Sequence, residues 1–93
     1  MNRVFLSGEL ICRDEADVAI VCKHLPLHLA LTRAEPGCIR FDVQQTNNPL
    51  IWRVDEEFVD EVAFAEHQVR TTSSEWGTAT AGMMRDYHTT EEQ

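Results

Sequence analysis

The stretch EPGCIRFDVQQTNNPLIWRVDEEF, residues 35–58, decides the fold because it contains two strands and the turn that joins them. Apolar and polar residues alternate from Ile39 to Val43, which predicts one strand of this pair. The alternation returns from Leu50 to Phe58 and sets Glu56 on the same face as large apolar side chains. The turn-forming residues of Thr46–Pro49 lie between the two strands, so the stretch predicts an antiparallel hairpin.

Helix signals flank this hairpin on both sides. Before it, Asp14 offers an N-cap oxygen and apolar residues then recur at helical spacing, which predicts a helix over residues 15–33. After it, a second helix is expected from about residue 60, followed by a short third helix that Ser73 or Ser74 can cap. The hairpin therefore lies between two helical segments.

A strand is expected at each end of the chain. Residues 3–11 alternate and place Ser7 on the face opposite Val4, Leu6, Gly8 and Leu10. Residues 85–90, with Tyr87 in the middle, have the composition of a short last strand, and the final three residues are expected to fray. The order β-α-β-β-α-β predicts a ferredoxin-like α+β fold with a four-stranded antiparallel sheet, and residues 1–93 are interpreted as a single domain.

The predicted strands carry apolar or aromatic side chains on both faces, although helices would cover only one of them. An identical subunit is the simplest cover for the second face, because a two-fold axis buries the same patch twice. The pattern predicts a homodimer.

Charge and length exclude several classes of protein. The 93 residues include 16 acidic and 8 basic ones, and the formal net charge of -8 repels phosphate backbones and disfavours nucleic acid as a partner. No apolar run approaches the roughly 18 to 20 residues that cross a bilayer, and no secretory leader is evident, so a cytoplasmic protein without membrane contact is expected.

The three cysteines lack C-x-x-C spacing and are expected to be reduced, mostly buried thiols. His24 and His28 stand four residues apart but lack a third ligand, and they are expected on the solvent face without a metal.

Three motifs carry a resemblance to a known family. They are EPGCIRFDV from Glu35 to Val43, DEVAFAEH from Asp60 to His67, and Trp76 nine residues further on. Together they resemble the antibiotic biosynthesis monooxygenase family, of quinol monooxygenase-like type within the dimeric α+β barrel superfamily. The resemblance implies a homodimer whose sheets form a β-barrel, with a pocket in each subunit between its sheet and its helices. Family members include cofactor-independent oxygenases of quinols and polycyclic phenols, haem-degrading enzymes, and isomerases of small metabolites.

His67 and Glu56 are the candidate catalytic residues. His67 matches the family's histidine, and imidazole can remove a phenolic proton near neutral pH; alternatively it only fixes its helix on the sheet. Glu56 stands between apolar neighbours, so its carboxylate needs a partner or a raised pKa. If Glu56 pairs with His67, it would set the imidazole tautomer; the alternative is a polar contact at the subunit interface.

Six residues are candidates for substrate binding, because they supply flat apolar surface or a hydrogen-bonding group, although each could instead be an ordinary core or strand residue. They are Trp52, Phe58, Phe64, Trp76, Tyr87 and Ser7. Haem-degrading relatives carry an axial histidine on the short helix and an asparagine on the first strand. Here Trp76 and Thr72 occupy the helical region and Ser7 falls near the asparagine position, so haem is not expected, and no cofactor is.

The leading functional hypothesis is a cofactor-independent monooxygenase that oxidises a small quinol or polyketide-like phenol with molecular oxygen. In it, His67 assisted by Glu56 deprotonates the substrate inside a dry aromatic pocket. Two alternatives stay open. One is a non-catalytic module that binds a small metabolite in the same pocket, and the other is an isomerase of a small carbonyl compound.

Overall fold

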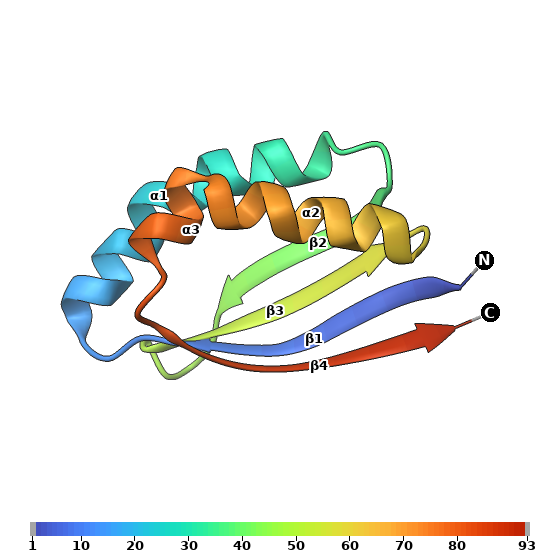
Figure 1. Cartoon of the computed structure of the whole chain (residues 1–93). Helices are drawn as coiled ribbons and strands as arrows, with labels where there is room; N and C mark the ends of the chain where they lie inside the picture. The colour runs from blue at the N-terminus through green and yellow to red at the C-terminus, as the bar shows by residue number, and fades with distance from the viewer. Residues whose placement is uncertain (1, 93) are drawn as a thin grey trace.

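The computed structural model describes residues 2–92, which form one four-stranded antiparallel sheet with three helices on one of its faces (Figure 1). The strand order across the sheet is β2-β3-β1-β4. In chain order the elements are β1 (Arg3–Ile11), α1 (Glu15–Arg33), β2 (Cys38–Gln45), β3 (Ile51–Phe58), α2 (Glu61–Ser73), α3 (Glu75–Ala79) and β4 (Met84–Glu92). The ferredoxin-like α+β fold that the sequence predicts is confirmed.

The element bounds agree with the sequence patterns except at the end of the chain. The helix expected over residues 15–33 is α1, and its N-cap is Asp14, whose side chain accepts a hydrogen bond from the Asp17 N–H. The last strand is longer than residues 85–90, because β4 pairs with β1 along its whole length. The expectation of a frayed end is therefore wrong for Glu91 and Glu92, and Gln93 lies outside the described residues.

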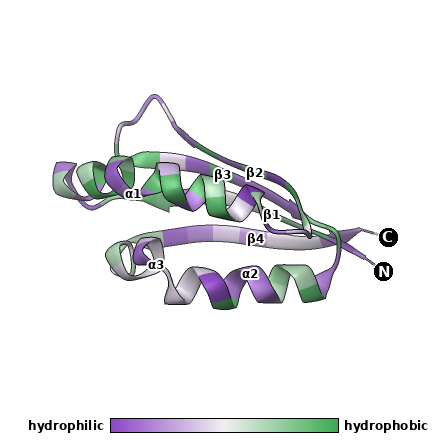
Figure 2. Cartoon of the chain, turned by 90° about the horizontal axis from the view of Figure 1, so that it is seen from above, coloured by the Kyte–Doolittle hydropathy of each residue, from purple (hydrophilic) through white to green (hydrophobic). Residues whose placement is uncertain are grey.

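The core lies between the sheet and the helices. Seen from above, α1 runs on the β2 side of the molecule and α2 on the β4 side (Figure 2). Leu10 of β1 and Val21 of α1 are completely shielded from solvent, and Trp52 and Val54 of β3 belong to the same apolar cluster. Every second residue of β1 and β3 points into this layer, so the polar residues on that face occupy a mostly apolar environment.

The opposite face of the sheet is more polar than the sequence analysis expects. Phe5, Ile11, Ile51 and Met84 are apolar side chains on this face, and the register places Ile11 opposite both Ile51 and Met84. The remainder is largely charged, and ion pairs between arginine and carboxylate side chains lie along it, among them Arg3–Glu57, Arg53–Asp55 and Arg40–Asp42. Apolar side chains on both faces are thus confirmed only in part.

Two further expectations concern cysteines and membranes. Cys12, Cys22 and Cys38 are free thiols as expected, although Cys22 is exposed and Cys38 half-buried. Across residues 2–92, the helices are too short or too polar to pass through a bilayer.

Ser74 links α2 to α3 and resolves the alternative between Ser73 and Ser74 as a cap. Its Oγ accepts a hydrogen bond from the Gly77 N–H at 3.1 Å and donates one to the Thr71 carbonyl at 2.6 Å. We expect Ser74→Ala to lower the free energy of unfolding by about 1 kcal/mol, because the first turn of α3 loses its cap. Urea denaturation measures this loss, and Ser73→Ala is the matched control, since the exposed Ser73 hydroxyl only donates to Val69 within α2. Equal losses in the two variants would contradict the capping role.

Candidate functional site

A cavity of about 140 Å³ lies between the sheet and the helices, and all four strands and all three helices described contribute to its wall. Its apolar wall includes Leu6, Phe41, Val43, Val54 and Trp76. Its polar groups are His28, Glu56, His67, Gln68, Thr71, Arg85 and Tyr87. Small-molecule sites usually combine mostly apolar surface with converging polar groups, and this cavity has both, with an unusually large share of polar residues in its wall.

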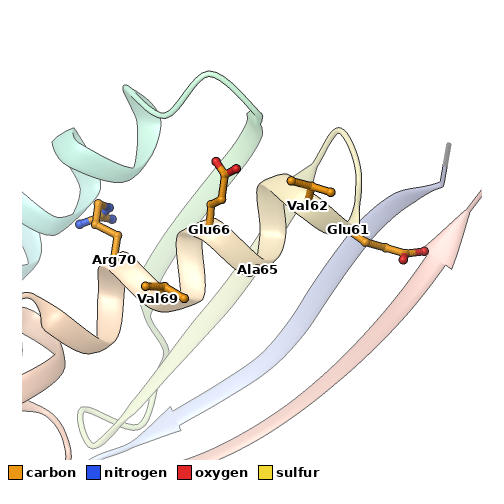
Figure 3. Close-up of a pocket in the computed structure, with 6 residues that line it drawn as sticks. All are labelled: Glu61, Val62, Ala65, Glu66, Val69 and Arg70. Carbon is orange, nitrogen blue, oxygen red and sulfur yellow. The ribbon is translucent and has the colours of Figure 1, made fainter.

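A larger hollow of about 540 Å³ lies on the outer side of α2, where Figure 3 shows its lining side chains. Its polar groups are Glu61, Glu66 and Arg70, and all of its lining residues come from one helix. Val62 and Val69 in this hollow are largely exposed to water. Chemistry that needs converging groups in a dry site is better served by the smaller cavity.

His67 of α2 is buried and held from one side by a carboxylate. Its Nδ1 lies 3.0 Å from Glu35 Oε1, and its Nε2 lies 3.4 Å from Thr71 Oγ1 and 3.7 Å from Glu56 Oε1. Glu35 also accepts a hydrogen bond from Arg70. If Nδ1 carries the proton that Glu35 accepts, then Nε2 is left as a proton acceptor at the cavity.

The loop between α1 and β2 brings Glu35 to His67. Gly37 in this loop packs so closely on α2 that a Cβ at its position would collide with the Cβ of Ala63. The Gly37 carbonyl accepts a hydrogen bond from the Val59 N–H at 2.9 Å, which ties the loop to the end of β3. Gly37, two residues after Glu35, therefore permits the close approach that lets Glu35 reach His67.

Glu56 of β3 lies on the helix-facing side of the sheet, as its alternation with apolar residues predicts. Burial, and secondarily the negative charge of Glu35, raise the pKa of Glu56 to about 8. Its Oε1 finds no hydrogen-bond partner among residues 2–92. At pH 7 the Glu56 side chain is thus a neutral carboxyl that can donate a hydrogen bond into the cavity.

The pairing of Glu56 with His67 differs from the sequence hypothesis. The 3.7 Å between Glu56 and the His67 Nε2 is too long for a hydrogen bond, and the contact that sets the tautomer is made by Glu35. Burial lowers the pKa of His67, with the charge and hydrogen bond of Glu35 opposing it. His67 is accordingly neutral at pH 7 and able to accept a proton.

His28 of α1 is buried, so the expectation that it faces solvent is wrong. Its ring stacks on Trp76 with centroids 4.7 Å apart and planes within 4° of parallel. Burial and then the charge of Arg70 lower the pKa of His28 to about 3, so the ring is neutral at physiological pH. Its Nδ1 is buried without a hydrogen-bond partner in the described part of the chain, which leaves a polar atom available to a ligand.

Tyr87 of β4 lies opposite Gly8 of β1 and points into the cavity. Burial raises the pKa of Tyr87 to about 12, although the nearby Arg85 lowers it in part. The phenol therefore stays protonated and can donate a hydrogen bond to an oxygen atom of a ligand.

The predicted site residues separate into two groups. His67, Glu56, Trp76 and Tyr87 line the cavity together. The other four do not line it. The Phe58 ring packs on the His67 ring with centroids 4.8 Å apart, and Phe64 packs on Phe58. Trp52 lies in the apolar core, and Ser7 is on the opposite face of the sheet.

Sequence reasoning missed three polar residues near His67. Glu35 stands in the motif EPGCIRFDV without a predicted role, and His28 is expected on the solvent face together with His24. Arg85 at the start of β4 also lines the cavity. Among residues 2–92, no three His, Cys, Asp or Glu side chains are arranged to hold a metal ion.

Comparisons with known proteins agree on the fold. The family model for antibiotic biosynthesis monooxygenase matches residues 22–79. The chain is similar in structure to protein SO0527 from Shewanella oneidensis (TM-score 0.76, 19% identity, 98% of this chain and 91% of that chain covered). It is also similar to SnoaB, a cofactor-independent oxygenase from Streptomyces nogalater (TM-score 0.75, 13% identity, 97% and 92% covered), and to MupZ from Pseudomonas fluorescens (TM-score 0.77, 15% identity, 96% and 68% covered). At these identities the structural likeness shows the fold alone. No curated protein matches the chain at a significant level.

Proposed function

The chain belongs to the antibiotic biosynthesis monooxygenase family, and we propose that it is a cofactor-independent monooxygenase that oxidises a small quinol or polyketide-like phenol with molecular oxygen. The observation that carries this proposal is His67: a neutral imidazole whose Nε2 borders a mostly apolar cavity while Glu35 binds its Nδ1. SnoaB, a cofactor-independent oxygenase, has the same fold, which supports the reaction class.

The first step is removal of a proton from a phenolic hydroxyl. The Nε2 of His67 takes this proton, and the Nδ1–H stays hydrogen-bonded to Glu35, whose negative charge stabilises the imidazolium that forms. Arg70 and Thr32 support the arrangement, because Arg70 binds Glu35 and donates to the Thr32 hydroxyl at 2.8 Å. The resulting phenolate is an electron-rich anion that can reduce oxygen.

The second step transfers electrons from the substrate to oxygen. One oxygen atom of O₂ bonds to a ring carbon and replaces its hydrogen, while the other oxygen atom leaves as water. A hydroquinone and one O₂ thus give one hydroxyquinone and one water, and the substrate supplies all four electrons, so no separate reductant is needed. The neutral Glu56 carboxyl and the Tyr87 hydroxyl are placed to donate hydrogen bonds to substrate oxygens.

The cavity walls would protect the anion from water. Phe41 and Trp76 cover it with aromatic surface, and both are almost completely buried. Exclusion of water favours transfer of electrons to oxygen over reprotonation of the phenolate.

The homodimer and the cytoplasmic location expected from the sequence are further parts of this proposal. The apolar side chains of Phe5, Ile11 and Ile51 on the outer face of the sheet support the homodimer.

Oxygen uptake with a panel of hydroquinones and anthrones tests the proposal. We expect one O₂ consumed for each substrate oxidised, no hydrogen peroxide released, and the same rate when EDTA is present and flavin is absent. Release of hydrogen peroxide, which catalase converts back to oxygen, would contradict insertion of oxygen into the ring. A ligand that raises the melting temperature without oxygen uptake would favour the binding module, and isomerisation of a carbonyl compound without oxygen uptake would favour the isomerase.

A further inference from the structure

Another hollow, distinct from the one on the outer side of α2, adjoins the cavity from outside. This outer groove, of about 160 Å³, lies between α1 and the α2–α3 junction, where Leu27 and Leu31 form its apolar side. His28 and Trp76 line both the groove and the cavity. The stacked rings of these two residues therefore stand between the two spaces.

The ring pair is held by packing. His28 Nδ1 makes no hydrogen bond to any of residues 2–92, and His28 and Trp76 face one another at 4.7 Å between centroids. A shift of the His28 ring would therefore break no hydrogen bond at Nδ1, and a ligand with a polar substituent could supply the missing one. The pair has the properties of a gate that a ligand can open.

The two spaces are individually small for a ligand site. Small-molecule pockets usually measure about 300–1,000 Å³, whereas the cavity holds about 140 Å³ and reaches the lower end of that range, about 300 Å³, only together with the groove. A single aromatic ring fits the cavity, and a larger ligand must continue beyond the ring pair.

The groove offers apolar surface for that continuation. Leu27 is 55% exposed and Leu31 is 44% exposed, and they lie one helical turn apart on α1. We infer that the substrate is an extended phenol, whose ring lies in the cavity beside His67 and whose apolar substituent passes between His28 and Trp76 into the groove over Leu27 and Leu31. This inference rests on the proposed function, since it names the substrate class of that same site.

The outer side of α2 is the competing place for an apolar substituent. Val62 and Val69 are 64% and 69% exposed there, and Figure 3 shows both side chains on the outer side of the helix. No residue that lines this hollow also lines the cavity. A ligand whose ring lies in the cavity therefore reaches Leu27 directly beyond the ring pair, whereas it reaches the hollow with Val69 only after crossing the groove and Arg70, which lines both.

Two probes and two variants test the inference. Phenol and 4-hexylphenol are titrated by calorimetry under argon, so that no oxidation occurs. For the wild-type protein we expect 4-hexylphenol to bind at least tenfold more tightly than phenol, because the hexyl chain is transferred out of water when it enters the groove. Leu27→Asp should reduce this ratio to threefold or less and leave the Kd of phenol unchanged, since Leu27 does not line the cavity. Val69→Asp, which adds the same charge at a valine that is more exposed than Leu27, should retain the wild-type ratio.

The outcomes separate this inference from the proposed function. If phenol binds but the hexyl chain brings no gain, or if Val69→Asp abolishes the gain and Leu27→Asp does not, the extended substrate is wrong while the cavity site stands. If neither phenol nor 4-hexylphenol binds to the wild-type protein, both proposals fail. Melting curves by circular dichroism confirm that the two exposed substitutions leave the fold intact.

Discussion

His67→Ala is expected to lower kcat/KM for quinol oxidation by about 10² to 10⁴-fold, the usual contribution of a general base. In the proposed mechanism the imidazole receives the phenolic proton, and the neutral carboxyl of Glu56 cannot replace it as a base at pH 7. Oxygen-electrode rates at several substrate concentrations measure the effect. Because His67 is buried against Phe58, its removal leaves a hole, and added imidazole should enter that hole and restore part of the rate.

His88→Ala is the matched control for this experiment. The His88 side chain is 79% exposed on the opposite face of the sheet, so its loss should leave the rate unchanged. Glu35→Gln should give an intermediate rate, because the amide oxygen can still accept the Nδ1–H but no longer carries the charge that stabilises imidazolium. Equal rates for wild type and His67→Ala would remove His67 from the mechanism. A loss without rescue by imidazole would favour a structural role.

The fold was predictable because its signals are local. The N-cap at Asp14 and the helical spacing after it define α1, and the alternation around Phe41 and Trp52 defines the hairpin strands. Each of these signals depends only on residues that lie a few positions apart in the sequence. The length of β4 was underestimated for the opposite reason, since Glu91 and Glu92 join the sheet only because β1 lies beside them.

The candidate site was predictable only in part, because its contacts join distant parts of the chain. The pattern of β3 correctly gives Glu56 an apolar environment, and His67 matches a family motif, so both reach the cavity. Glu35 is 32 residues from His67 in sequence, and its approach depends on Gly37 packing against α2. Nothing in the local pattern tells which of the two carboxylates contacts the imidazole. His28 was likewise misplaced, since its burial results from Trp76 on another helix.

Glu56→Gln is expected to stabilise the protein at pH 7 by on the order of 3 kcal/mol. In the folded chain, burial raises the pKa of Glu56 from its ordinary 4.5 to about 8. Below pH 4.5 both the folded and the unfolded chain hold the proton, so this carboxyl makes no difference to stability. Between pH 4.5 and 8 the unfolded chain releases the proton and the folded chain keeps it, so stability falls as the pH rises. Glutamine resembles the protonated carboxyl in shape but does not ionise, so the variant escapes this loss.

Urea denaturation of wild type and Glu56→Gln at several pH values between 4.5 and 8.5 measures this difference, and the titration of the other groups largely cancels between the two proteins. The gain should be near zero at pH 4.5 and should increase up to about pH 8. Glu57→Gln is the control, because it removes a neighbouring carboxylate on the opposite face and should lack the gain at pH 7. In the proposed mechanism a carboxyl that weakens the fold in this way has a use, since a neutral donor beside a phenolate helps to hold the anion. A gain that does not depend on pH would mean that Glu56 ionises normally, and an anion in the cavity would then repel the phenolate that the proposed reaction requires.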